Sequence, residues 1–166
     1  MELRKSKKGG VTDLVYIMIV LVVFGAIVLF GFKFMSEVNT QFQASDIINQ
    51  QGKDSTQAIT NLFPNVIDNT FLFLMIGLCL ITLVLAMLVV IHPVFFILYF
   101  VFLAIVIFVG GILSNIYQTM AANAQLVDVA NQLTYISHIL SYLPIIIGVF
   151  GFVLAVVMYR TYQHSI

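Results

Sequence analysis

Residues 71–113 read FLFLMIGLCLITLVLAMLVVIHPVFFILYFVFLAIVIFVGGIL. The stretch is apolar almost throughout, and its one clear break is the pair His92 and Pro93. A bilayer core of roughly 30 Å needs about 20 helical residues to cross it. Proline lacks an amide hydrogen and fits the first position of a helix. The stretch therefore predicts two membrane spans, 70–91 and 94–113, joined by a tight turn at His92 and Pro93.

Two more apolar runs flank this pair. The first follows a basic segment, residues 1–10, and predicts a span over 11–35. The last predicts a span over 139–160, with Pro144 either in the first turn of the helix or at a kink, and a short tail at 161–166. The predicted fold is an all-α integral membrane helical bundle with four transmembrane helices, including a tight helical hairpin, and short amphipathic segments.

The composition excludes an ordinary soluble domain, because 61% of the residues are hydrophobic and only 8% are charged. Residues 36–69 are rich in Asn, Gln, Ser and Thr and predict a polar loop with at most short amphipathic helices. Residues 114–138 are also polar but carry apolar residues every three or four positions. This spacing predicts an amphipathic helix that either extends the third span or lies on the membrane surface.

The positions of the charges predict the orientation. The side with both termini holds Arg4, Lys5, Lys7, Lys8 and Arg160. The other side holds Lys33 and Lys53 with the acidic residues Glu37, Asp46, Asp54, Asp68 and Asp128. Because Lys and Arg gather on the cytoplasmic side of membrane proteins, both termini are expected to be cytoplasmic.

The candidate sites are structural rather than catalytic. We expect lipid or capsid contact from Arg4, Lys5, Lys7, Lys8 and Arg160, although the basic cluster also fits a signal for topology alone. We expect close helix packing at the small residues Gly110, Gly111, Ser114, Gly148, Gly151 and Ala155. His92 and Pro93 are expected to form only a turn. The chain shows no clustered nucleophile and base and no set of metal ligands, and the apolar runs of the spans (14–32, 71–91, 94–113 and 139–159) hold no strongly ionisable residue. We therefore expect no enzyme activity, no metal and no cofactor.

The layout resembles that of small multi-span integral membrane proteins of tailless icosahedral viruses and phages with an internal lipid membrane. The resemblance covers most of the chain as a pattern of segments and includes no catalytic or binding motif. It is carried by the Asn- and Gln-rich loop and by five short segments: Arg4-Lys5-Ser6-Lys7-Lys8, Asp68-Asn69-Thr70-Phe71-Leu72-Phe73, His92-Pro93-Val94-Phe95-Phe96, Ser114-Asn115-Ile116-Tyr117 and Leu143-Pro144-Ile145-Ile146.

The resemblance implies a structural role in the internal membrane of a virion, which the protein would help to shape or link to the capsid. Before assembly the chain would reside in the host cytoplasmic membrane. The implied partners are the lipid bilayer, further copies of the chain or other membrane proteins, and viral capsid proteins, with no specific nucleic acid. The alternatives are a holin-like protein that permeabilises membranes and an accessory subunit of a larger membrane complex.

Overall fold

A computed structural model describes residues 11–88 and 93–163. Every regular element in these two ranges is a helix. The helices are α1 (Val11–Ala44), α2 (Gln50–Leu88), α3 (Pro93–Ala121), α4 (Val127–Gln132), α5 (Thr134–Ser141) and α6 (Leu143–Gln163). Helices α1, α2, α3 and α6 are long and apolar enough to cross a membrane. The predicted all-α bundle with four membrane-spanning helices is confirmed.

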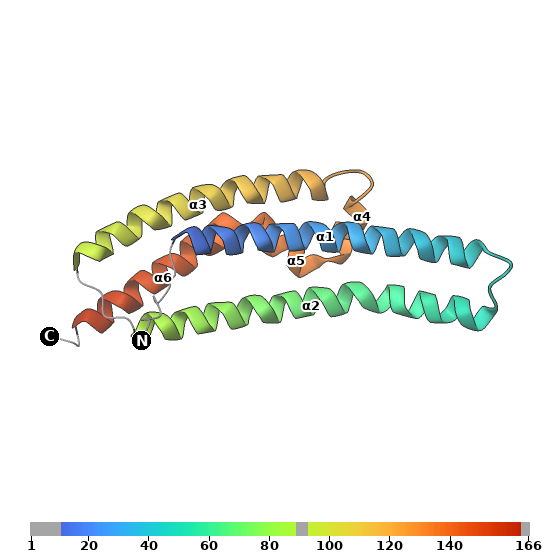
Figure 1. The fold of residues 1–166 in the computed structure, drawn as a ribbon, viewed down its shortest axis with the longest axis horizontal. Coiled ribbons are helices and arrows are strands. Elements are labelled where there is room, and N and C mark those ends of the chain that lie inside the picture. Colours follow the sequence, from blue (N-terminus) through green and yellow to red (C-terminus); the bar gives the residue numbers. More distant parts are fainter. Residues whose placement is uncertain (1–10, 89–92, 164–166) are drawn as a thin grey trace, which may run out of the picture.

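The four long helices lie side by side (Figure 1). Helix α1 packs against α2 and α3, and α6 packs against the same two helices from the other side. Helix α1 begins and α6 ends at one end of the bundle, and the connection between α1 and α2 lies at the other end (Figure 1). Pro93 is the first residue of α3, and Pro144 lies in the first turn of α6, so the first-turn alternative for Pro144 is correct.

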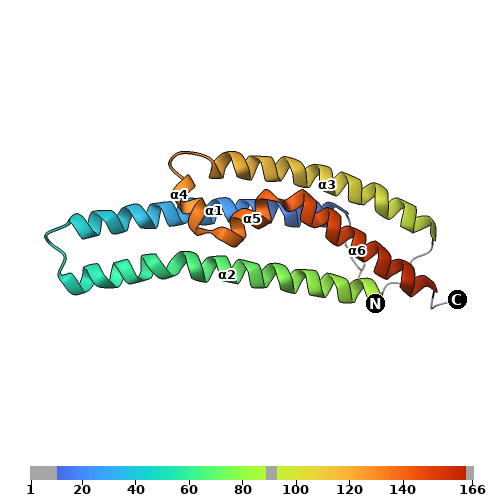
Figure 2. The same ribbon diagram turned by 180° about the vertical axis from the view of Figure 1, so that it is seen from behind.

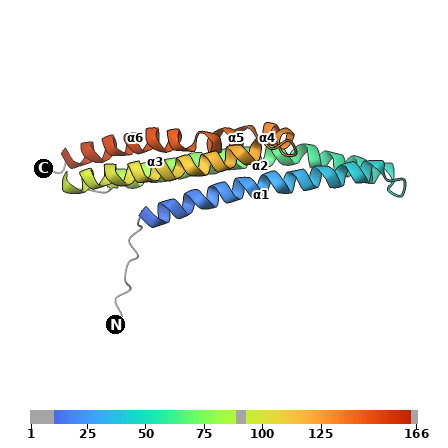
Figure 3. The ribbon, with the colours of Figure 1, turned by 90° about the horizontal axis from the view of Figure 1, so that it is seen from above.

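The predicted polar loop at 36–69 is almost entirely helical, so the prediction of a loop with short helices is wrong. Helices α1 and α2 continue through it and leave only residues 45–49 as a connection. The side-chain oxygen of Asn49 accepts a hydrogen bond from the backbone amide of Gly52, at 2.9 Å, and thereby caps the start of α2. The two helices form a hairpin that projects beyond α3 and α4 (Figure 3).

Polar side chains explain why this segment folds as paired helices. The amide of Asn39 donates to the side-chain oxygen of Gln57 at 2.7 Å. Nearer the tip, the amide of Gln43 donates to the carbonyl of Lys53, and the ammonium of Lys53 donates to the carbonyl of Gln43, both at 2.8 Å. Each helix therefore provides hydrogen-bond partners for the other, which an isolated polar loop would take from water.

Two stacked aromatic pairs fix the register of the hairpin. The rings of Phe24 and Phe71 lie 5.9 Å apart, and those of Phe32 and Phe63 lie 5.6 Å apart. The two pairs are separated by the same number of residues on both helices, so the antiparallel register is constant between them. By this register, Asp68 lies beside residues 27 and 28 of α1.

The segment predicted to be one amphipathic helix, 114–138, is divided. Its first part extends α3 to Ala121, as one alternative proposed, and the rest turns back to form α4 and the start of α5. Helices α4 and α5 fold against α1 between α2 and α3 (Figure 2), so this part does not lie as a separate helix on a membrane surface. Of the apolar residues in this segment, Ala130 and Leu133 are buried, whereas Ile116 and Val127 are exposed.

The core gathers around α5. Leu133, Ile136 and Leu140 have no exposed surface, and they pack with residues of α1, α2 and α3 in one cluster. Gly25 of α1 makes room for this packing, because a Cβ atom there would lie within 2.2 Å of Leu140. The segment with α4 and α5 is polar in composition, but its apolar residues join those of α1, α2 and α3 in the buried cluster.

Candidate functional site

The most unusual side chain in the described part of the chain is Asp68 of α2. Only 5% of its surface is exposed, although it is a carboxylate within an apolar bundle. Its Oδ2 atom accepts a hydrogen bond from the backbone amide of Tyr135 at 2.8 Å, and Oδ1 accepts one from the amide of Ile136 at 2.7 Å. Both amides belong to the first turn of α5.

These amides need a partner because of their position in the helix. The first four amides of an α-helix have no intrahelical acceptor and carry a partial positive charge. The residue that precedes α5 is Leu133, and it offers no side-chain cap. Asp68 provides the missing acceptor from another helix. Hydrogen bonds to a charged group contribute roughly 1.5–3 kcal/mol each, so the carboxylate stabilises both the start of α5 and its docking on α2.

The other end of α5 is held by α3. The hydroxyl of Ser114 donates a hydrogen bond to the carbonyl of Ser141. The side-chain amide of Gln118 donates to the same carbonyl at 2.8 Å. Between the two ends, the hydroxyl oxygens of Tyr117 and Ser137 lie 3.1 Å apart. Asp68, Ser114, Tyr117, Gln118 and Ser137 are hereafter called the α5 clamp.

The structure corrects the predicted position of Asp68. The sequence pattern assigned this residue to a loop facing water, whereas the structure buries it beside the apolar run of α1. The signal that identifies it is helical spacing: Asp68, Phe71 and Met75 are three and four residues apart and therefore share one face of α2. Because Phe71 is buried and Met75 packs against the core, a carboxylate on the same face must also point inward.

The predicted packing residues lie mainly between α3 and α6. A Cβ atom on Gly151 would lie 2.3 Å from the side chain of Leu103, and one on Gly110 would lie 3.1 Å from those of Met18 and Ile147. The other small residues have looser or different surroundings. Gly148 has ordinary contact with α3, Ala155 is buried, Ser114 belongs to the α5 clamp, and Gly111 has open space around it.

Most of the predicted contact residues lie outside the described ranges. Arg4, Lys5, Lys7, Lys8 and the turn residue His92 are among them. Arg160 lies within the described ranges and is exposed in the last turn of α6. Its positive charge there interacts favourably with the negative end of the helix dipole. The predicted contact of these residues with lipid or capsid stays a prediction.

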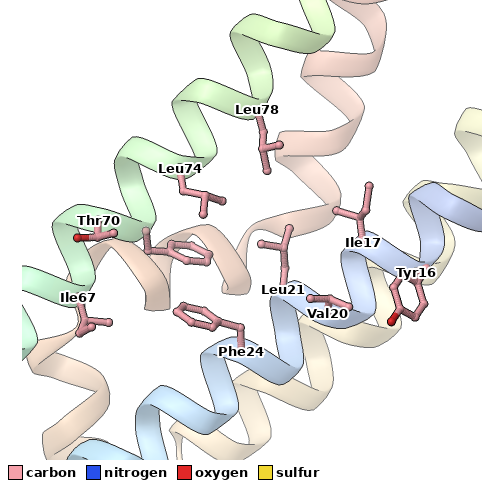
Figure 4. Close-up of a pocket in the computed structure, with 10 residues that line it drawn as sticks. Tyr16, Ile17, Val20, Leu21, Phe24, Ile67, Thr70, Leu74 and Leu78 are labelled. Carbon is pink, nitrogen blue, oxygen red and sulfur yellow. The ribbon is translucent and has the colours of Figure 1, made fainter. Parts of the chain in front are cut away.

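A groove of about 440 Å³ lies between the apolar halves of α1 and α2 (Figure 4). Its lining is apolar except for Tyr16 and Thr70. Phe24 and Phe71, which stack on each other, belong to its lining, and Leu74 and Leu78 extend along one side. Such a wall suits an apolar chain, and the hydroxyl of Thr70 already donates to the carbonyl of Val66 in its own helix.

Comparison with protein-family models, curated proteins and solved structures finds no match to this chain. Within residues 16–84 and 96–160, no group of three His, Cys, Asp or Glu side chains could hold a metal ion. Across the same ranges, every buried side-chain nitrogen and oxygen has a hydrogen-bond partner. Among the buried polar side chains there, Asn39, Asp68 and Ser114 bond to another helix, whereas Thr60 bonds within α2.

Proposed function

We propose that this chain is a structural membrane protein, in which a helical anchor holds a rigid helical hairpin away from the bilayer. The observation that carries the proposal is the use of the buried polar groups. Asp68 bonds to the backbone of α5, and Ser114 and Gln118 bond to the same helix from α3. These contacts fix the relative positions of the helices and engage both carboxylate oxygens of Asp68 and the hydroxyl of Ser114.

The length of the hairpin supports the same proposal. Helices α1 and α2 contain 34 and 39 residues, so at 1.5 Å per residue each is more than about 50 Å long, against roughly 30 Å for a bilayer core. The excess carries the paired amides of Asn39 and Gln57. A stiff extension of this kind suits a protein that sets a distance or a shape at a membrane.

For the setting we propose the internal membrane of a virion, with the host cytoplasmic membrane as the place of residence before assembly. This part of the proposal rests on the resemblance of layout. In that setting the end of the bundle with Arg160 and the basic segment 1–10 faces the capsid. The hairpin then lies on the opposite face of the membrane.

Reconstitution tests the structural role. The purified chain is inserted into unilamellar vesicles of phosphatidylcholine and phosphatidylglycerol loaded with a fluorescent dye. We expect the dye to be retained while cryo-electron microscopy shows a narrowed distribution of vesicle diameters. Dye release that rises with the amount of protein would contradict the proposal and favour the holin-like alternative.

A second experiment tests the viral setting. The tagged chain is followed through density-gradient purification of particles released by its host cells, and we expect it to sediment with lipid and capsid protein. A variant in which Arg4, Lys5, Lys7 and Lys8 are replaced by Gln should enter the membrane but be depleted from particles, whereas Lys33→Gln on the hairpin should not be. Co-purification with a cellular enzyme or transporter instead would identify an accessory subunit.

A further inference from the structure

The exposed apolar surface of the bundle is longer than a bilayer core. Met18 of α1 lies beside Gly110 of α3, and these two helices run in the same direction (Figure 1). Phe34 lies sixteen residues beyond Met18, and Ile97 lies thirteen residues before Gly110. Phe34 and Ile97 are 72% and 70% exposed, and at 1.5 Å per residue they are separated by about 43 Å along the bundle. A bilayer core of roughly 30 Å cannot cover both.

Polar landmarks show which end is left outside. The ring of Phe96 packs on that of Tyr159 beside Arg160, which marks one edge of the membrane. Ser114 and Gln118 begin the polar part of α3, and Ser114 lies about 27 Å from Phe96 along the helix, close to one core thickness. The apolar parts of α2 and α6 fall between the same two edges. The hydrocarbon layer therefore ends near Ser114.

Beyond that edge the hairpin still exposes apolar side chains. Phe34 lies about 18 Å past the level of Ser114, whereas the headgroup layer accounts for only about 5–8 Å on each side. The exposed residues recur at intervals of three and four, which places them on one stripe of each helix. We define the hairpin stripe as Ile27, Phe30 and Phe34 of α1 with Ile59, Leu62 and Val66 of α2, all of which are more than half exposed.

We propose that the hairpin stripe is the surface through which two copies of this chain associate. Side chains of this size, more than half exposed, each present on the order of 100 Å². The six together present about 600 Å² per copy, against roughly 800 Å² per partner in a standard interface, and the neighbouring polar residues can supply the rest. A water-facing apolar surface of this extent needs a cover.

A second copy fits this surface better than another partner for two reasons. All copies cross the membrane in the same direction, so a twofold axis along the membrane normal places the stripes of both copies at the same height. The stripe is also flanked by neutral amides such as Gln41, Asn61 and Asn65, and Lys33 is paired with Glu37 at 3.0 Å. Two identical faces of this kind meet without net repulsion between like charges.

Cysteine cross-linking in native membranes tests the proposal. In a Cys79→Ser background, single cysteines are introduced by Phe34→Cys or Leu62→Cys, with Asn131→Cys on the exposed face of α4 as the matched control. After mild oxidation we expect most of the chain to migrate as a dimer for the two stripe variants and as a monomer for the control. Equal cross-linking at all three positions, or none at any of them, would overturn the proposal.

Two further measurements exclude other covers. The double variant Phe34→Glu with Leu62→Glu should be a monomer in sedimentation velocity runs, whereas Asn131→Glu should remain a dimer. A dimer that survives both changes places the contact elsewhere and refutes the proposal. Nitroxide labels are attached to cysteines introduced by Phe30→Cys or Ile59→Cys in the monomeric variant, and they should be accessible to a water-soluble nickel complex. If they collide only with oxygen dissolved in lipid, the bilayer covers the stripe and the proposal is wrong.

Discussion

Removal of the Asp68 carboxylate should release α5 from α2. In the variant Asp68→Ala, the amides of Tyr135 and Ile136 lose their acceptors, which lie 2.8 and 2.7 Å away in the wild-type chain. The amide of Ile136 is buried, so water cannot replace the carboxylate without opening the core. The start of α5 then has no cap, because Leu133 provides none.

The magnitude depends on these two bonds. An unsatisfied buried donor costs about 1–3 kcal/mol, which applies in full to the amide of Ile136. The amide of Tyr135 is only partly buried and loses less because water can reach it, so the two losses together cost roughly 2–5 kcal/mol. The variant also avoids the cost of burying a charge, which is several kcal/mol in an apolar environment and offsets part of the loss. We therefore expect the free energy of unfolding to fall by about 2–4 kcal/mol for Asp68→Ala. Asp68→Asn keeps one acceptor oxygen and should lose roughly half as much.

Two readouts separate this local effect from a general one. Unfolding in detergent micelles by a denaturant, followed by circular dichroism, gives the change in free energy. Hydrogen exchange should become faster in residues 134–141 and stay nearly unchanged in the middle of α3 and α6. Asp46→Asn, at an exposed position between the hairpin helices, is the control and should change neither readout. If Asp68→Ala behaves like this control, the clamp does not hold α5 and the reasoning is refuted.

The two remaining predictions concern helix pairs. Gly151→Ala should lower the free energy of unfolding by about 1–3 kcal/mol, because the new methyl group would overlap the side chain of Leu103. Gly111→Ala has open space around it and should be neutral or stabilising by up to about 1 kcal/mol. Thermal unfolding measures both variants, and equal effects would contradict the packing described. Asn39→Ala should cost about 1 kcal/mol by removing the bond to Gln57 and should speed hydrogen exchange in the outer hairpin; exchange that changes only in α6 would argue against the pairing.

The hairpin shows where reasoning from local composition stops. Asn, Gln, Ser and Thr are typical of loops, so the composition of 36–69 predicts a loop. Those residues form helices here because each helix meets an antiparallel partner that accepts and donates hydrogen bonds, as Asn39 and Gln57 do. Pro64 does not break α2, although it removes one helical hydrogen bond. Packing of Phe63 on Phe32 offsets that loss.

The candidate site is harder to predict than the spans. The stripe of apolar residues in 114–138 predicts helix correctly, but it does not reveal the turn between Ala121 and Val127 or the burial of the residues after that turn. Asp68 and the first turn of α5 are 67 and 68 residues apart in the sequence. No local pattern connects two positions at that distance, so the contact emerges only when the helices pack.

The order of the amino acids is enough to specify the fold class and the four spans, because long apolar runs can be accommodated only by helices in a bilayer, where every backbone amide must be satisfied within its own segment. It also places Pro93 at a helix start, because proline lacks an amide hydrogen and fits the first turn, and it leaves Pro144 either in a first turn or at a kink. Tertiary packing sets the length of the hairpin, the folding of α4 and α5 into the bundle and the burial of Asp68. These features depend on partners that are distant in the chain, and their energies exist only once those partners are in contact.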